Sequence, residues 1–231
     1  MESKLNIHIA RLPTIHKHKL TSSFLLAGAL VLVSSFTHAV MGDNEGIKSK
    51  ESVVKHAPLV SIPTHDAFFQ LIAEHCGKAF AGKVVLDTEP SEAFAQPLVM
   101  HVRNCTDTQL QVPFHVGDDA SRTWIITKTG SGLSLKHDHR MASGHDDELT
   151  MYGGHTVDAG HNNMQSFPAD QYSKELFVNL GIPQSVGNTW QVFVYPNKFT
   201  YRLIRQGREF RVDFDLTKPI DLPVTPWGYS D

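Results

Sequence analysis

The amino-acid sequence predicts a mostly β domain: an antiparallel up-and-down β-barrel with a short N-terminal helix and one helix inserted between later strands. The first observation is that apolar and polar residues alternate along most of the chain after residue 80, a period typical of half-buried strands. The second is that short segments rich in glycine, asparagine or aspartate separate these runs, as in hairpins. The third is that the runs lack βαβ spacing, so a parallel sheet is not expected.

Before this domain, residues 1–39 have the pattern of a secretory signal peptide. An apolar run at residues 24–33 follows four basic side chains, and small residues, Thr37 and Ala39, occupy the −3 and −1 positions of a cut after Ala39. The run is shorter than the roughly 20 apolar residues that span a bilayer. We therefore expect cleavage and no stable membrane anchor afterwards, with an uncleaved anchor as the alternative.

The sequence thus divides into a signal peptide (1–39), a polar flexible leader (40–63) and a single barrel-type domain (64–231), and it predicts an exported protein, periplasmic or secreted. Residues 40–231 hold 17 basic and 23 acidic side chains, a formal charge of −6. This charge argues against binding to nucleic acid or to an anionic membrane surface. Hydrophobic residues make up 41% of the chain and charged residues 19%, which excludes a coiled coil and a wholly disordered chain.

The first expected element is a helix that begins near Thr64 or Asp66 and ends at Gly77. Its apolar residues follow the i, i+3, i+4, i+7 spacing of one helical face: Phe68, Leu71, Ile72 and His75. Cys76, at its end, and Cys105 are the two cysteines of the chain. In an oxidising compartment such a pair predicts one disulfide. A catalytic or metal-binding thiol is the alternative, although no C-x-x-C motif supports it.

The strands follow in order along the chain. Residues 98–103 and 110–115 alternate around a loop at 104–108, and residues 124–127 and 133–137 flank a turn at 129–132. Further strands are expected at residues 149–152, where Gly153 and Gly154 would end the strand, and at residues 164–167.

The later part of the chain predicts the inserted helix and three more strands. The helix begins at residues 168–170 and closes at Gly181, with an apolar stripe of Tyr172, Leu176, Phe177 and Leu180. The strands are expected at residues 190–194, 199–203 and 210–214. After Lys218 three prolines predict an irregular tail.

Histidines are the candidate site residues, because seven of the 14 fall between residues 101 and 161. In a strand through residues 133–139, Leu133, Leu135, His137 and His139 share one face. Two imidazoles at this spacing can reach one zinc or copper ion. A metal site needs three or four ligands, and the candidates for the others are His115, His155 and His161. The alternatives are histidines solvated in a loop, or buried histidines that are hydrogen-bonded.

Arg122 and Trp124 form the second candidate, since both would lie on one strand face. An arginine near the end of a barrel is suited to plug it or to clamp a ligand, and the alternative is an arginine that reaches solvent. Arg140 and Tyr152 would join His137 around an anionic ligand in this interpretation. The sequence contains no G-x-S-x-G, H-E-x-x-H, P-loop or Rossmann motif, so no standard signature points to an enzyme.

Several segments resemble an uncharacterised family of exported bacterial proteins, and the resemblance covers most of residues 65–228. They include Cys76-Gly-Lys-Ala-Phe-Ala-Gly-Lys83, Ser121-Arg-Thr-Trp124, Leu135-Lys-His-Asp-His-Arg140 and Tyr152-Gly-Gly154. This resemblance implies export and a single domain, and it transfers no activity. The expected barrel preceded by a helix is also similar to the lipocalin and calycin group, whose Gly-x-Trp is replaced here by the stretch around Gly77 and Phe80.

The leading functional hypothesis is non-catalytic binding of a small apolar or mixed-polarity molecule inside the barrel. An eight-stranded barrel has room for packed side chains or one small ligand. The expected lining is Arg122, Trp124, Leu135, His137, His139 and Tyr152. One alternative is a metal-binding protein or metal-dependent enzyme that uses His137 and His139 with zinc or copper. Another is a structural envelope protein with a solid core and no ligand.

Overall fold

The structure is a computed structural model that describes residues 62–90 and 92–230. The expected signal peptide (1–39) and the leader up to residue 61 lie outside the described residues, so both stay predictions. Within residues 62–90 and 92–230, no helix has the length and apolar character needed to cross a membrane.

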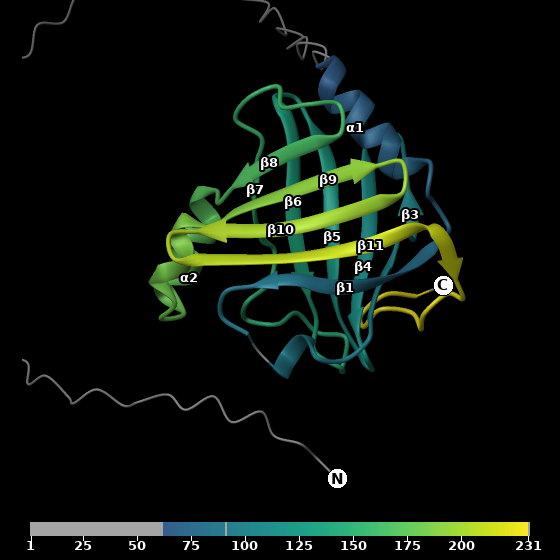
Figure 1. Cartoon of the computed structure of the whole chain (residues 1–231). Coiled ribbons are helices and arrows are strands. Elements are labelled where there is room, and N and C mark those ends of the chain that lie inside the picture. Colours follow the sequence, from purple (N-terminus) through teal and green to yellow (C-terminus); the bar gives the residue numbers. More distant parts are fainter. Residues whose placement is uncertain (1–61, 91, 231) are drawn as a thin grey trace, which may run out of the picture. The chain divides into compact units, whose positions relative to one another are not determined.

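The described chain folds into a nearly closed antiparallel barrel, and the predicted fold class is confirmed (Figure 1). Ten strands pair in the order β7-β6-β5-β4-β2-β1-β11-β10-β9-β8, and the short β3 pairs with β4. In Figure 1 the strands β8–β11 cross in front of β4–β6. The strands are β1 (Ala79–Asp87), β2 (Leu98–His101), β3 (Asn104–Cys105), β4 (Gln109–Val116), β5 (Asp119–Thr129), β6 (Gly132–His139), β7 (Tyr152–His155), β8 (Met164–Pro168), β9 (Thr189–Tyr195), β10 (Lys198–Arg205) and β11 (Arg208–Ile220).

The barrel closes between β7 and β8 through a few backbone contacts. Gly154 forms a bridge with Ala169, and the Asp170 amide donates a 3.0 Å hydrogen bond to the Gly153 carbonyl. A Cβ atom on Gly154 would lie 2.0 Å from the Pro168 carbonyl oxygen. The prediction that the two glycines end a strand at residue 152 was wrong, because β7 contains both of them. They permit a close backbone approach instead.

Helix α1 (Pro63–Ala73) packs at one end of the barrel, against β8 and β9. Phe68, Phe69 and Ile72 on its inner face are buried, as the apolar spacing indicated for Phe68 and Ile72. The helix ends at Ala73 rather than at Gly77. The predicted disulfide between Cys76 and Cys105 is present and ties the segment after α1 to β3.

Helix α2 (Gln171–Asn179) is the helix predicted between later strands. The Asp170 side chain caps it by accepting a 2.9 Å hydrogen bond from the Ser173 amide. Phe177 is buried, but Tyr172 and Leu180 of the predicted stripe are exposed. The short 3₁₀ helices η1 (Glu92–Phe94) and η2 (Pro183–Gly187) complete the fold.

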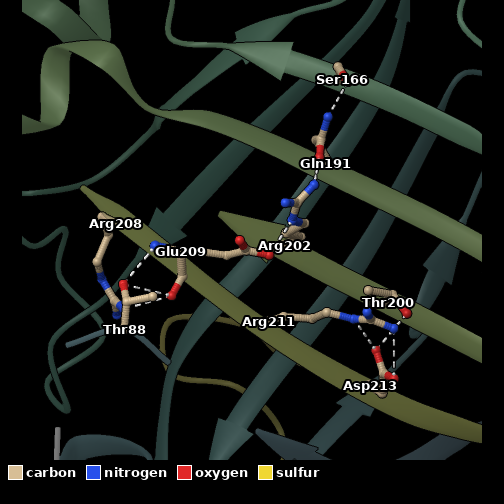
Figure 2. Close-up of polar contacts among 9 residues, drawn as sticks. All are labelled: Thr88, Ser166, Gln191, Thr200, Arg202, Arg208, Glu209, Arg211 and Asp213. Carbon is tan, nitrogen blue, oxygen red and sulfur yellow. Dashed lines mark hydrogen bonds and ion pairs between the residues drawn. The ribbon is translucent and has the colours of Figure 1, made fainter. Parts of the chain in front are cut away.

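The outer face of the late strands is polar, as the alternation predicts. On β8–β11, side chains one strand apart form a hydrogen-bonded row (Figure 2). Gln191 donates to Ser166 at 3.0 Å, and Arg202 donates to Gln191 and to Glu209, each at 2.8 Å. The residues that alternate with this row point inward, which leaves an apolar interior.

The irregular tail predicted after Lys218 begins two residues later, because β11 continues to Ile220. The irregular C-terminal segment at residues 221–230 contacts the outside of the barrel. The Trp227 amide donates to the Ala120 carbonyl at 3.0 Å, and the Tyr229 hydroxyl donates to Asp138 at 2.6 Å. Asp138 lies between the inward-facing His137 and His139 in sequence and therefore faces outward. It is buried and also accepts a 2.9 Å hydrogen bond from Arg140.

Candidate functional site

The candidate site is a cavity of about 200 Å³ inside the barrel, at the end where β5 begins. Helix α1 lies at the other end, where Asp66 forms a 2.8 Å ion pair with Lys128 near the end of β5. Eight of the 17 lining residues are aromatic: Phe94, Phe114, Trp124, Tyr152, Phe177, Trp190, Tyr201 and Phe210. The other nine are Arg122, His137, His139, Leu149, Ile182, Ser185, Asn188, Leu203 and Arg208.

A larger hollow of about 610 Å³ lies on the outside, where β1 and β11 change register. Its charged side chains pair with each other, for example Lys198 with Asp213 at 3.2 Å. It is an open groove on the surface, whereas the interior cavity lies among the inward-facing side chains of the barrel. The interior cavity is therefore the better candidate for a specific site.

Five of the six residues predicted to line the barrel meet at this cavity. They are Arg122, Trp124, His137, His139 and Tyr152. The sixth, Leu135, is buried as expected but is not among the residues around the cavity. Leu135 is therefore a core residue and does not line the cavity.

Aromatic rings from opposite sides of the barrel form the floor of the cavity. Trp124 on β5 stacks on Tyr201 of β10, with ring centroids 4.5 Å apart and an interplanar angle of 11°. His137 on β6 stacks on Tyr152 at 4.6 Å and lies 5.0 Å from the Trp190 ring. The Trp124–Tyr201 and His137–Trp190 contacts join non-adjacent strands across the interior, whereas His137 and Tyr152 are cross-strand neighbours on β6 and β7.

His137 is buried and hydrogen-bonded at both ring nitrogens. Nδ1 lies 3.1 Å from the Tyr152 carbonyl oxygen, and Nε2 lies 2.8 Å from the Tyr201 hydroxyl oxygen. A carbonyl can only accept, so Nδ1 carries the proton and Nε2 accepts from Tyr201. Burial lowers the pKa of His137 to about 3. The residue is thus a neutral imidazole that belongs to the floor.

His139 lies nearer the mouth of the cavity, opposite Arg122 in the pairing of β5 and β6. Its Nε2 is 3.2 Å from the Tyr152 hydroxyl. Burial, followed by the nearby charge of Arg122, lowers the pKa of His139 to about 4. Burial also raises the pKa of Tyr152 to about 12. Both groups are uncharged at neutral pH.

The arginines of the lining are held in different ways. The guanidinium of Arg122 lies 6.0 Å from the Phe94 ring centroid, rather than on Trp124, and its Nη1 pairs with Asp119 at 2.6 Å. Arg208 pairs with two carboxylates, Asp87 and Glu89. Arg140, which the sequence suggested as a partner of His137, lies on the outer face with Asp138.

The histidines do not assemble into a metal site in this structure. Both nitrogens of His137 are already engaged, His115 is buried on β4 and does not line the cavity, and His155 and His161 are exposed. Among residues 62–90 and 92–230, no group of three or more His, Cys, Asp or Glu side chains is placed to hold a metal ion. This geometry favours the alternative of buried, hydrogen-bonded histidines.

Sequence reasoning did not assign the second half of the cavity wall. Trp190, Tyr201 and Phe210 lie in the late strands that the sequence predicts at residues 190–194, 199–203 and 210–214, where core packing explains an inward aromatic side chain equally well. No sequence pattern indicated Asn188 as a lining residue, because it lies in the loop that precedes β9. It is 6% exposed, and its Oδ1 has no hydrogen-bond partner within the described part of the chain.

Comparisons of the chain with protein-family models, curated proteins and solved structures gave no match. The interpretation of the cavity therefore depends on its own geometry.

The buried histidines make stability depend on pH. Their pKa values are lower in the folded chain than the ordinary 6.5, so the unfolded chain binds more protons as the pH falls from about 6.5 towards 4. Each histidine then removes up to about 1.4 kcal/mol of stability per pH unit. We expect His139→Gln to reduce this slope by about that amount in urea unfolding between pH 4.5 and 7.

The substitution His145→Gln, at an exposed histidine, is the matched control for this measurement. An unchanged slope in His139→Gln would contradict the assigned burial of that imidazole.

Proposed function

We propose that the barrel binds one small molecule in its interior cavity and does not catalyse a reaction. The observation that supports this most is a cavity of about 200 Å³ in which eight of the 17 lining side chains are aromatic, with a smaller number of polar groups among the rest. Ligand sites are typically concave and apolar with a small number of placed polar groups. A cavity of about 150 Å³ is known to bind benzene. The size therefore fits a ligand of about one ring.

Asn188 supports an occupant that carries a hydrogen-bond donor. The residue lines the cavity, and its Oδ1 is buried without a hydrogen-bond partner among the described residues. A buried acceptor left unsatisfied costs about 1 to 3 kcal/mol. A ligand hydroxyl or amine group would remove this cost, so a ring with one donor fits both the size and the polarity of the site.

The chemistry of the lining supports binding rather than catalysis. Among the 17 lining residues of the described chain there is no Asp, Glu, Cys or Lys. The two histidines have pKa values of about 3 and 4, far from the neutral range in which a general base is efficient. These groups can orient a ligand but have little capacity to move a proton.

The disulfide supports a site of action after export. Disulfides persist in oxidising compartments such as the periplasm and the extracellular medium. We therefore place the ligand-binding barrel in the periplasm or outside the cell, in agreement with the signal-peptide pattern of residues 1–39 and the resemblance to exported bacterial proteins.

Phenol is a suitable probe, because it combines one ring with one donor. We expect saturable 1:1 binding of phenol to the chain by isothermal titration calorimetry. Ser185→Trp would place a large side chain at the half-buried edge of the cavity and is expected to weaken binding at least tenfold. Ser131→Trp in the exposed turn between β5 and β6 is the matched control. The absence of phenol binding, or equal binding by Ser185→Trp, would refute the proposed function.

A further inference from the structure

We propose that the ligand of the cavity is a planar single-ring carboxylate, whose carboxylate group is bound by Arg122. This inference rests on the proposed function and specifies the chemical class of the ligand. Three observations support it: the charged groups of the lining, the N–H donors of Arg122 that no described residue uses, and the aromatic rings that line the cavity.

The charge of the lining is one-sided. It contains two arginines, Arg122 and Arg208, and no carboxylate among the 17 described residues that form it. Both arginines pair with carboxylates that lie outside the lining, so the lining itself presents cationic groups and no carboxylate, which favours an anionic ligand over a cationic one. The two lining histidines add no charge at neutral pH, since burial lowers the pKa of each.

Of the two arginines in the lining, Arg122 is the one with N–H donors that no described residue engages. Arg208 is 11% exposed at its side chain and is held between Asp87 and Glu89. Arg122 is 23% exposed, and only its Nη1 is engaged, with Asp119. Its Nε and Nη2 make no hydrogen bond within residues 62–90 and 92–230. A guanidinium has five N–H donors and binds a carboxylate with two of them, so these atoms suit a ligand carboxylate.

The position of Arg122 directs its charge into the cavity. It is the direct cross-strand neighbour of His139, and Trp124 follows on the same face of β5. Its charge is the second cause, after burial, of the lowered pKa of His139. A carboxylate bound at Arg122 would therefore place its attached ring against Trp124.

The aromatic walls favour a flat ligand. Phe114 and Tyr201 each stack on Trp124, at interplanar angles of 18° and 11°, and all three rings line the cavity. Offset-stacked and edge-on contacts with such rings favour another planar ring. The volume of about 200 Å³ limits the ligand to about one ring with small substituents.

The test compares benzoate with benzamide, which has nearly the same shape but no charge. By isothermal titration calorimetry, we expect the wild-type chain to bind benzoate at least about tenfold more tightly than benzamide. Arg122→Gln is expected to remove this preference. The control is Arg202→Gln, which makes the same exchange in the hydrogen-bonded row on the outer face (Figure 2), and it should keep the preference.

Each outcome separates this inference from the proposed function. Equal or weaker binding of benzoate by the wild-type chain, with phenol still bound, would overturn the carboxylate assignment and leave the binding function intact. A preference that survives Arg122→Gln and disappears in Arg208→Gln would overturn the assignment to Arg122. If phenol, benzoate and benzamide all fail to bind, the proposed function fails as well. The wild-type comparison needs no variant, so it decides the carboxylate question even if Arg122→Gln does not fold.

Discussion

Gly154→Ala is expected to lower the free energy of unfolding by at least about 3 kcal/mol, because overpacking of this kind strains the fold. The added Cβ would lie 2.0 Å from the Pro168 carbonyl oxygen. The clash is with backbone, so no side chain can turn away to relieve it. The strands β7 and β8 would have to separate, and the backbone contacts that close the barrel would be lost.

Gly187→Ala is the matched control for this prediction, since nothing lies within 4 Å of a Cβ at that position. Urea unfolding of both variants measures the difference. A change of less than about 0.5 kcal/mol in Gly154→Ala, similar to that of an ordinary surface substitution, would show that the barrel does not close through these glycines.

Cys76→Ser is expected to destabilise the chain by about 3 to 4 kcal/mol in the chain-entropy description of a disulfide. The bond joins residues separated by 29 positions in sequence, and its removal releases this loop in the unfolded chain. The change should appear as a lower midpoint in urea unfolding under oxidising conditions.

A double-mutant comparison provides the control for the disulfide. Cys105→Ser should lower the free energy of unfolding by about as much as Cys76→Ser. The double variant should lower it by little more than either single variant, because all three lack the same bond. A freely titrating thiol in the native wild-type chain would contradict the pairing. Additive losses in the double variant would show that the two cysteines stabilise the fold independently.

The alternation of apolar and polar residues was enough to predict the barrel and the face on which the candidate residues lie. Leu133 and Leu135 must face the core, so a strand through residue 139 turns His137 and His139 inward as well. The two cysteines likewise predicted their own pairing. These features depend on local periodicity and on composition, which a single sequence contains.

The partners across the barrel interior could not be predicted in the same way. Tyr201, which hydrogen-bonds to His137, is 64 residues away in sequence, and alternation gives the face of a strand but not what lies opposite. No prediction was made for Asn188, because it lies in the loop before β9, outside the alternating segments. Gly153 and Gly154 were read as chain breakers, because the close approach of β8 that requires them appears only in the folded barrel.

The size of the cavity depends on the summed volumes of side chains from most of the strands and three helical segments. A small change in any of them would fill the space, so the sequence predicted an interior without establishing whether it is packed or hollow. The same limit applied to the arginines, since the carboxylates that pair with Arg122 and Arg208 decide which of the two has free donors.

The most direct test of the ligand-binding cavity uses the three tryptophans of the chain. Trp124 and Trp190 line the cavity, whereas Trp227 belongs to the C-terminal segment on the outside of the barrel. We would titrate ¹⁵N-labelled protein with phenol and follow the three indole N–H signals. The cavity predicts saturable shifts of the Trp124 and Trp190 signals with an unmoved Trp227 signal. Shifts confined to Trp227, or no shift in any of the three, would contradict binding inside the barrel.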